Sequence, residues 1–162
     1  MKKFLLTAVL AAMTMCVNAQ DLVTYDGPKF SVQHPADYKD VVDPWDDAVN
    51  EWKKSDGIRL TVWFESDCAT TDQLLVLADM VKQQRETDAD DQPTGWKAEN
   101  PVQKGNIVTI RSVKGDIVCY EYLLNIGGSD CFKGEFTFLQ SEEAQYKPLL
   151  DTILASIKKK NS

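Results

Sequence analysis

The sequence predicts an α+β fold in which an antiparallel β-sheet has helices packed on it. Three observations carry this prediction. Residues 58–65 alternate between apolar and polar side chains, three strand-like segments linked by hairpin turns follow one another between residues 106 and 139, and helical spacing of apolar residues appears over 71–86 and 147–158. Strands and helices in this order form layers around one hydrophobic core.

The first twenty residues have the pattern of an export signal. Two lysines precede residues 4–17, which are apolar apart from two threonines, and Val17-Asn18-Ala19 then supplies small residues for cleavage. The apolar run is shorter than the roughly 20 residues that a membrane span requires. The sequence therefore predicts a signal peptide over 1–19 and a single domain over 20–162 that is exported, either periplasmic or secreted.

Size and charge restrict the partners of this domain. The chain of 162 residues has a net charge of −7, and without the two leader lysines the charge is −9. Phosphate groups bind clustered Lys and Arg, so neither nucleic acid nor an anionic membrane is expected as a partner. The only basic run, 158–160, is expected to complement the end of the last helix. A domain of this size needs no metal or cofactor to fold, and none is expected.

The first half of the domain contains three strand signals and one helix signal. Residues 22–35 read as two strand segments around a Gly27-Pro28 turn, and 58–65 form the clearest strand. The helix over 71–86 begins at a capping box made by Thr70 and Gln73.

The stretch DPWDDAVNEWKKSDG, residues 43–57, has two alternatives. Asp43 as cap, Pro44 at the first helical position and apolar residues at i, i+4 and i+7 favour a helix. A turn at 43–47 followed by a strand, joined to 58–65 through Ser55-Asp56-Gly57, agrees better with an antiparallel sheet. The strand is the favoured alternative.

The second half contains three strands and a closing helix. Strands are expected over 106–113, 116–126 and 131–139, with turns at Lys114-Gly115 and Gly127-Gly128. The closing helix is expected near 147–158, with Pro148 marking its beginning because proline disrupts a helix interior.

Two stretches resemble the PsbP-like family. KFSVQHPADYK is similar to the opening strand and bend of these domains, and EEAQYKPLLDTILASIK is similar to their closing helix. The resemblance implies an α/β/α sandwich around an antiparallel sheet, used as a non-enzymatic module that contacts a protein partner. No site residue is transferred, because the matching positions belong to the framework.

The four tryptophans provide the candidate ligand surface. Trp45, Trp52, Trp63 and Trp96 bring large aromatic area, most of it expected in the core. The alternative function is a small-ligand or glycan-binding protein that uses this Trp-rich surface.

Catalytic and metal-binding patterns are weak. His34 is the only histidine and is expected as a surface residue, which leaves little for nucleophilic catalysis. Residues 88–99 place acidic side chains near the spacing of a calcium loop, but Pro93 stands where a glycine is required, so a solvated loop is expected. No catalytic or metal-ligating residue is therefore assigned.

Three cysteines remain after the leader: Cys68, Cys119 and Cys131. If residue 126 pairs with 129 across the last hairpin, Cys131 lies opposite Leu124 and Cys119 opposite Phe136, too far apart for a bridge. Cys68 and Cys131 both lie at strand ends, which makes them the candidate disulfide. Acylation of Cys16 would make a lipoprotein instead, but Met15 is larger than the residue expected there.

Overall fold

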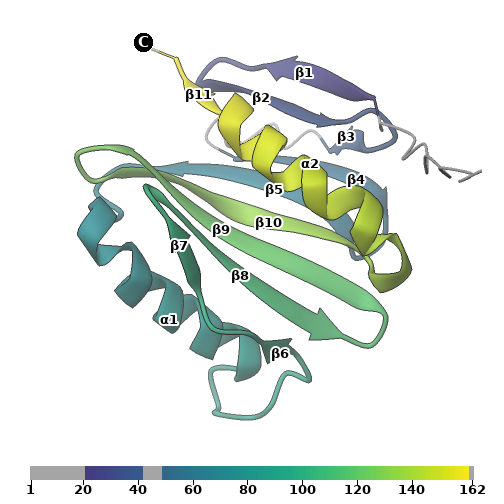
Figure 1. Ribbon diagram of the computed structural model, residues 1–162, viewed down its shortest axis with the longest axis vertical. Helices are drawn as coiled ribbons and strands as arrows, with labels where there is room; N and C mark the ends of the chain where they lie inside the picture. The colour runs from purple at the N-terminus through teal and green to yellow at the C-terminus, as the bar shows by residue number, and fades with distance from the viewer. Residues whose placement is uncertain (1–20, 42–48, 161–162) are drawn as a thin grey trace, which may run out of the picture.

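The computed structural model describes residues 21–41 and 49–160, which form two antiparallel sheets and two α-helices (Figure 1). The main sheet has eight strands in the order β3-β4-β5-β10-β9-β8-β6, and β7 also pairs with β8. Its strands are β3 (Lys39–Val41), β4 (Val49–Ser55), β5 (Ile58–Glu65), β6 (Lys97–Ala98), β7 (Val102–Lys104), β8 (Ile107–Lys114), β9 (Ile117–Gly127) and β10 (Asp130–Leu139). The expected α+β architecture with an antiparallel sheet is confirmed.

The second sheet is small and joins the two ends of the described chain. It contains β1 (Leu22–Asp26), β2 (Phe30–Pro35) and β11 (Lys158–Lys159), with β2 in the middle. Of the three lysines expected to complement a helix end, Lys158 and Lys159 are therefore part of a strand, because α2 already ends at Ser156.

The helices lie on opposite sides of the main sheet (Figure 1). Helix α1 (Leu74–Glu86) follows a 3₁₀ turn at Thr71–Gln73 and packs against β6, β7, β8 and β9. Gln73 Oε1 accepts a hydrogen bond from Thr70 N at 3.0 Å, as the predicted capping box requires. Helix α2 (Glu143–Ser156), after a 3₁₀ turn at Gln140–Glu142, packs against β2 and β10.

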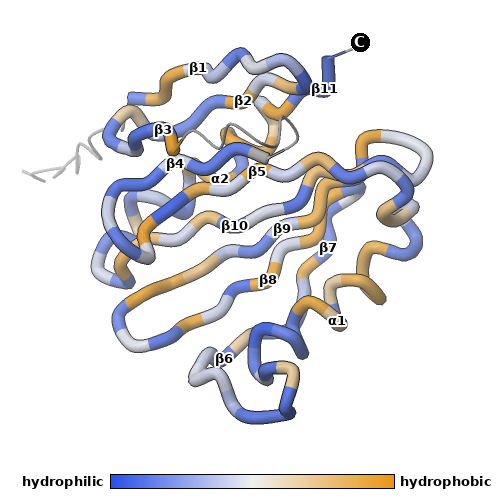
Figure 2. Tube along the Cα trace, turned by 180° about the vertical axis from the view of Figure 1, so that it is seen from behind, coloured by the Kyte–Doolittle hydropathy of each residue, from blue (hydrophilic) through white to orange (hydrophobic). Residues whose placement is uncertain are grey.

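Each side of the sheet has its own hydrophobic core, and hydrophobic stretches run along the central strands and along α1 (Figure 2). The core on the α2 side is large and aromatic, and includes Trp52, Phe132, Phe136, Phe138 and Tyr146. The core under α1 is smaller and made of short side chains, among them Ala69, Leu74, Ala78, Val108 and Ile110.

The favoured strand in the tryptophan-rich stretch is confirmed for residues 49–55. They form β4 and pair antiparallel with β5, so that Trp52 lies opposite Leu60. The helix alternative fails because the pairing with β5 places Trp52 in the core. Residues 42–48, including Trp45 and the expected turn, lie outside the described residues.

Helix α2 begins earlier than expected, and Pro148 lies inside it. A proline in a helix interior costs about 3 kcal/mol, since it removes one hydrogen bond and crowds the preceding turn. The burial of Tyr146, Leu150 and Ile153 from the same helix offsets this cost.

The predicted register of the last hairpin was wrong by one residue. Asp130 pairs with Gly127, and a bulge between Asp130 and Cys131 then places Cys131 opposite Asn125 and Cys119 opposite Thr137. The extra residue in a bulge is not visible in the alternation of side chains.

Candidate functional site

A groove of about 500 Å³ runs beside α1, on the side of the main sheet where that helix packs. Helix α1 contributes one wall through Val81 and Gln84, and strands β4, β5, β8, β9 and β10 contribute the floor. Because α1 packs over β6 to β9, the groove opens onto the half of this face formed by β4, β5 and β10.

The centre of the groove is a network of ion pairs around Glu135 on β10. One carboxylate oxygen of Glu135 bonds to Arg59 from β5, and the other lies 2.6 Å from Arg85 Nη2 on α1. Arg85 Nη2 also lies 2.8 Å from Glu121 Oε1 on β9 and 3.5 Å from the Cys119 sulfur. One helix and three strands therefore meet in a single charged cluster.

The cluster fixes the charge of Glu135. Burial raises the pKa of a carboxyl, but the hydrogen bond and charge of Arg85, together with the charge of Arg59, outweigh burial and hold the pKa of Glu135 below its usual value. Burial raises the pKa of the Cys119 thiol well above its usual value, although Arg85 acts in the opposite direction. Glu135 is thus ionised and Cys119 is a neutral thiol near pH 7.

The rim of the groove combines an aromatic ring with further charges. Trp63 on β5 is 44% exposed, and Lys133 Nζ lies over its ring, 4.4 Å from the centroid. Lys133 also pairs with Glu65, and Glu51 lies 3.7 Å from Arg59 Nη1. Arginine and tryptophan are the residues that most often dominate binding energy at protein interfaces.

The three tryptophans that the structure describes do not form one surface. Trp52 is fully buried in the α2-side core, where its ring stacks on His34 at 4.8 Å, so it was wrongly included in a ligand surface. Trp63 lines the groove, and Trp96 lines an adjoining hollow of about 260 Å³ that shares Val81 and Glu121 with it. The guanidinium carbon of Arg85 lies 4.9 Å from the centroid of the Trp96 ring.

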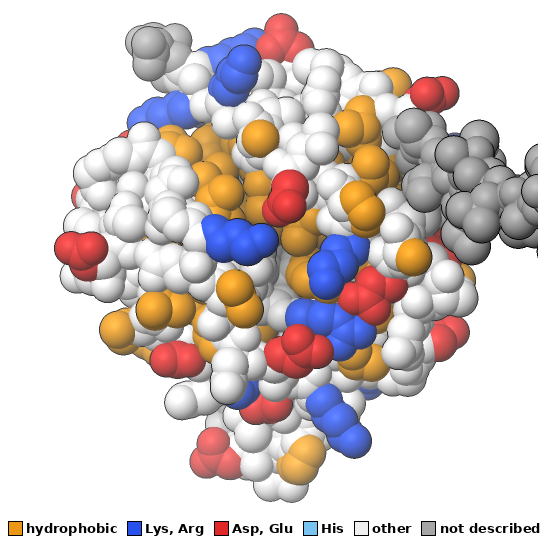
Figure 3. Space-filling view, viewed as in Figure 1, with side chains coloured by type: hydrophobic (Ala, Val, Ile, Leu, Met, Phe, Trp, Pro, Cys, Tyr) orange, Lys and Arg blue, Asp and Glu red, His pale blue; other side chains and the backbone are white. Residues whose placement is uncertain are grey.

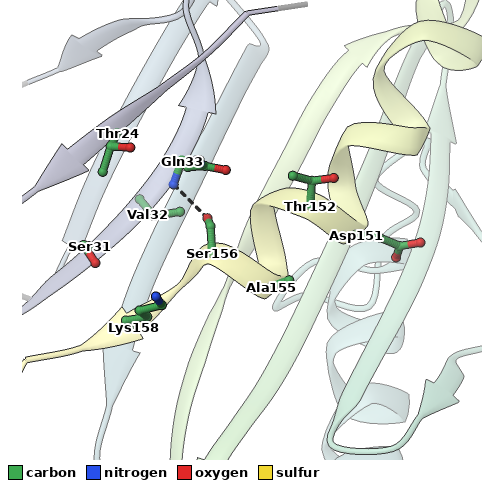
Figure 4. A pocket seen from close by; sticks show the side chains of 9 residues that line it. All are labelled: Thr24, Ser31, Val32, Gln33, Asp151, Thr152, Ala155, Ser156 and Lys158. Atoms are coloured by element: carbon green, nitrogen blue, oxygen red, sulfur yellow. Dashed lines mark hydrogen bonds between the residues drawn. The ribbon is translucent and has the colours of Figure 1, made fainter. Parts of the chain in front are cut away.

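A second hollow, of about 640 Å³, lies between the small sheet and the end of α2 (Figure 4). Its polar groups serve the fold: Ser156 Oγ accepts a hydrogen bond from Gln33 N at 2.8 Å and donates one to Ile153 O at 2.6 Å. The remaining lining side chains are mostly short, namely those of Thr24, Ser31, Val32, Asp151, Thr152, Ala155 and Lys158. The groove beside α1, with its aromatic and charged groups, is the stronger candidate.

The sequence matches no protein-family profile and no curated protein. Two solved structures are similar in fold. The solution structure of cyanobacterial PsbP (CyanoP) from Synechocystis sp. PCC 6803 matches with a TM-score of 0.60 at 14% identity, covering 88% of this chain and 94% of that one. The fold is PsbP-like.

The second similar structure is the Ran-binding protein Mog1p of Saccharomyces cerevisiae, with a TM-score of 0.53 at 13% identity over 86% of this chain and 95% of that one. At these identities the likeness establishes the PsbP-like fold, as the two sequence motifs predicted, and transfers no site.

Sequence reasoning missed the charged cluster of this PsbP-like domain. Alternation along 58–65 does place Arg59 on the same face as Trp63. Nothing in the sequence, however, connects Arg59 to Glu135, which lies 76 positions further along the chain, or to Arg85 between them. The available signal was a set of charged residues at inward positions of strands, where apolar residues are usual.

Two weaker candidates have structural roles. His34 was expected at the surface but is only 8% exposed, since the small sheet places it against Trp52; its Nδ1 lies 3.0 Å from Pro35 O. In the acidic loop, Asp88 Oδ1 accepts hydrogen bonds from the backbone amides of Asp90 and Gln92, both at 2.9 Å, and so closes a turn.

Proposed function

We propose that this protein is an exported, non-enzymatic binding module that holds another protein in the groove beside α1. The observation that carries the proposal is the chemistry of the groove. Over β4, β5 and β10, this face of the sheet bears paired charges and an exposed tryptophan instead of a hydrophobic cover. The solvated face of an antiparallel sheet usually carries exposed polar side chains, whereas here Arg85, Glu121 and Glu135 are largely shielded from water and joined in one network.

A protein is the partner that this chemistry suits. Interfaces between proteins are enriched in aromatic residues and arginine, with polar groups around them. Mog1p, which has a similar fold, is described as a Ran-binding protein. The net charge of −7 opposes nucleic acid, and charged side chains of both signs lie next to one another on the face shown in Figure 3.

One carboxylate oxygen beside the groove lacks a hydrogen-bond donor. Glu121 Oε2 is buried and has no hydrogen-bond donor among the described residues, whereas Glu121 Oε1 is paired with Arg85. A buried acceptor without a donor is unfavourable, so this oxygen is a cost to the fold that the groove retains.

The ionisation state of Glu135 in the groove supports a non-catalytic role. A general acid or base works best with a pKa near the working pH. Arg59 and Arg85 instead hold the pKa of Glu135 below its usual value, so that it stays ionised and paired.

Export rests on the predicted signal peptide over 1–19, which lies outside the described residues. In the part of the chain that the structure describes, no helix is long and apolar enough to cross a bilayer.

A glycan is the second candidate, favoured by Trp63 and Trp96 on the same side of the sheet. Sugars stack on free aromatic faces. Lys133 and Arg85 already lie over these two rings, so a sugar would need to displace a cation or use the opposite ring faces.

Site-specific photo-crosslinking in an exporting host tests the proposal. A photoreactive amino acid replaces Trp63 in the groove or, as a matched control, Val23 on β1, since these two residues are 44% and 42% exposed. We expect a discrete protein adduct from position 63 and none from position 23, and Arg59→Glu should diminish that adduct. Equal labelling from both positions, or an adduct from position 23 alone, would contradict a groove-bound partner.

Once the adduct is identified by mass spectrometry, titration of the purified partner gives the affinity. Trp63→Ala is expected to weaken binding at least tenfold, about 1.4 kcal/mol, as for an aromatic residue at the centre of an interface. Binding to a glycan array that Trp63→Ala abolishes, without a protein adduct, would favour the second candidate.

A further inference from the structure

Cys68 and Cys131 come from distant parts of the chain and lie in two segments that are hydrogen-bonded to each other. Cys131 is the second residue of β10 and pairs with Glu65 at the end of β5, three residues before Cys68. The backbone N–H of Cys68 donates to Ser129 O at 2.8 Å, and the Cys131 thiol donates to Ala69 O at 3.2 Å.

The two thiols are direct neighbours. Burial raises the pKa of the Cys68 thiol to about 12, and the neighbouring Cys131 thiol acts in the same direction. Cys68 is half-buried and Cys131 is fully buried, and both are free thiols in this structure.

The surrounding side chains hold this arrangement in place. Asn125, which pairs with Cys131 across the hairpin, donates through Nδ2 to Ala69 O at 2.8 Å and to Gly128 O at 3.0 Å. Ser129 Oγ donates to Asp67 Oδ1 at 3.0 Å. Hydrogen bonds therefore join the loop after β5 to the hairpin before β10 around the two cysteines, and these bonds keep the two thiols close to each other.

Cys119 is excluded from any such pairing. It lies opposite Thr137, six residues along β10 from Cys131, which corresponds to about 20 Å at 3.3 Å per residue. A disulfide requires Cα atoms within about 7 Å of each other. The Cys119 sulfur instead lies 3.6 Å from Glu135 Oε2, within the charged cluster.

We propose that Cys68 and Cys131 form a disulfide on exposure to a thiol oxidant, while Cys119 remains a thiol. The oxidant is a disulfide, either of an oxidoreductase or of glutathione. The more exposed Cys68 loses its proton and attacks one sulfur of the oxidant, which releases one thiol and leaves a mixed disulfide. Cys131 then loses its proton and attacks the Cys68 sulfur, which releases the second thiol. Two protein thiols are oxidised and one disulfide is reduced to two thiols.

The bridge would fasten the beginning of the α1 segment to the sheet. Cys68 precedes the 3₁₀ turn at Thr71–Gln73 by three residues, and α1 forms one wall of the groove. The proposed disulfide does not depend on which partner the groove binds. It would fix the beginning of α1, the helix that forms this wall of the groove.

Peptide mapping without reductant tests the proposal. The purified protein is unfolded, refolded in a mixture of oxidised and reduced glutathione, denatured again and alkylated. We expect one alkylated thiol per chain, at Cys119, and one linked peptide containing Cys68 and Cys131. Cys119→Ala should give the same linked peptide and no alkylated thiol, whereas Cys68→Ala should leave Cys131 unlinked to Cys119.

The rate of oxidation provides a second measurement on the folded protein. Because the pKa of Cys68 is raised, oxidation by glutathione should accelerate about tenfold for each pH unit between pH 7 and pH 9, as the thiolate fraction rises. Three alkylated thiols after refolding in the oxidising mixture, or a linked peptide that contains Cys119, would overturn the proposal.

Discussion

On the α2 side of the main sheet, β4 and β5 present Trp52 and Leu60, both fully buried among other apolar side chains. On the α1 side, β5 and β10 present Arg59 and Glu135, which pair with each other beside a groove. The same strands thus supply an aromatic core to one face and an ion-pair network to the other.

The difference separates what folds the domain from what is available for binding. Burial of apolar surface contributes about 25 cal/mol per Å², so the α2 side supplies most of the stability. Ion pairs removed from water gain little net stability, since desolvation offsets their attraction. The charged network held by three strands and a helix therefore adds little to the stability of the fold. We infer that it serves recognition.

The largest expected effect tests this comparison with two tryptophans. Trp52→Ala removes a fully buried ring and should lower the free energy of unfolding by about 3–5 kcal/mol. Trp63→Ala removes a ring that is 44% exposed and should lower it by less than about 1 kcal/mol. Urea denaturation of both variants measures the two changes, and equal losses would show that both faces support the fold alike.

The sequence predicted the helices and strands themselves better than it predicted which of them lie next to each other. Alternation over 58–65 correctly placed Arg59 and Trp63 on one face and Leu60 on the other, because side chains of a strand alternate regardless of tertiary context. Which face receives a helix depends on the connections between elements, and the sequence contained no sign that α1 would cover only β6 to β9.

Short elements and irregular pairings also escaped prediction. Strand β11 is two residues long and exists because Lys158 and Lys159 pair with β2, a segment more than 120 positions earlier. Pro148 suggested a helix start, but the burial of Tyr146 and Ile153 extends the helix past it. In these places tertiary contacts decide the structure, and local preference does not.

The second largest effect concerns the charged cluster. Glu135→Gln removes the carboxylate that Arg59 and Arg85 share. The loss should be about 2–3 kcal/mol, because Glu135 and Arg85 are largely buried, while Arg59 is partly exposed and the two arginines retain Glu51 and Glu121. Glu99→Gln is the matched control, because its side chain is 61% exposed and its partner Arg111 retains Glu143.

The control should change stability by less than about 0.5 kcal/mol. Thermal and urea unfolding at pH 7 measure both variants. If Glu135→Gln unfolds at the same urea concentration as the parent protein, the cluster is as weakly coupled to the fold as a surface ion pair.

A glycine on β10 gives the third effect. A Cβ atom at Gly134 would lie 1.9 Å from Thr61 O and 2.8 Å from the Tyr122 hydroxyl, which donates a hydrogen bond to that same oxygen at 2.7 Å. Gly134→Ala must therefore separate β10 from β5 and should cost about 2–3 kcal/mol.

Gly105→Ala separates this clash from a general effect of losing a glycine. Gly105 has a φ of +62°, and a methyl group there would meet no atom of the described residues within 4 Å. Alanine at this position therefore brings only backbone strain, about 1 kcal/mol. A smaller loss from Gly134→Ala than from Gly105→Ala in urea denaturation would argue against the close approach of the two strands.

The smallest effect is a pH dependence on the α2 side. Burial lowers the pKa of His34 from 6.5, although Pro35 O and the charge of Asp40 act in the opposite direction. The folded state therefore binds a proton less readily than the unfolded chain does. Stability from neutral His34 should be complete above pH 6.5 and should decline as the pH falls below 6.5 towards the lowered pKa.

The measurement compares urea denaturation at pH 7.5 and pH 5.5 for the parent protein and for His34→Gln. Glutamine removes the titrating group, so the variant should lose less stability than the parent protein between these two pH values, whatever its stability at pH 7.5. An identical loss in both proteins would assign the pH dependence to other groups. Because His34 stacks on Trp52, a smaller loss in the variant would assign this pH dependence to the α2 side of the sheet.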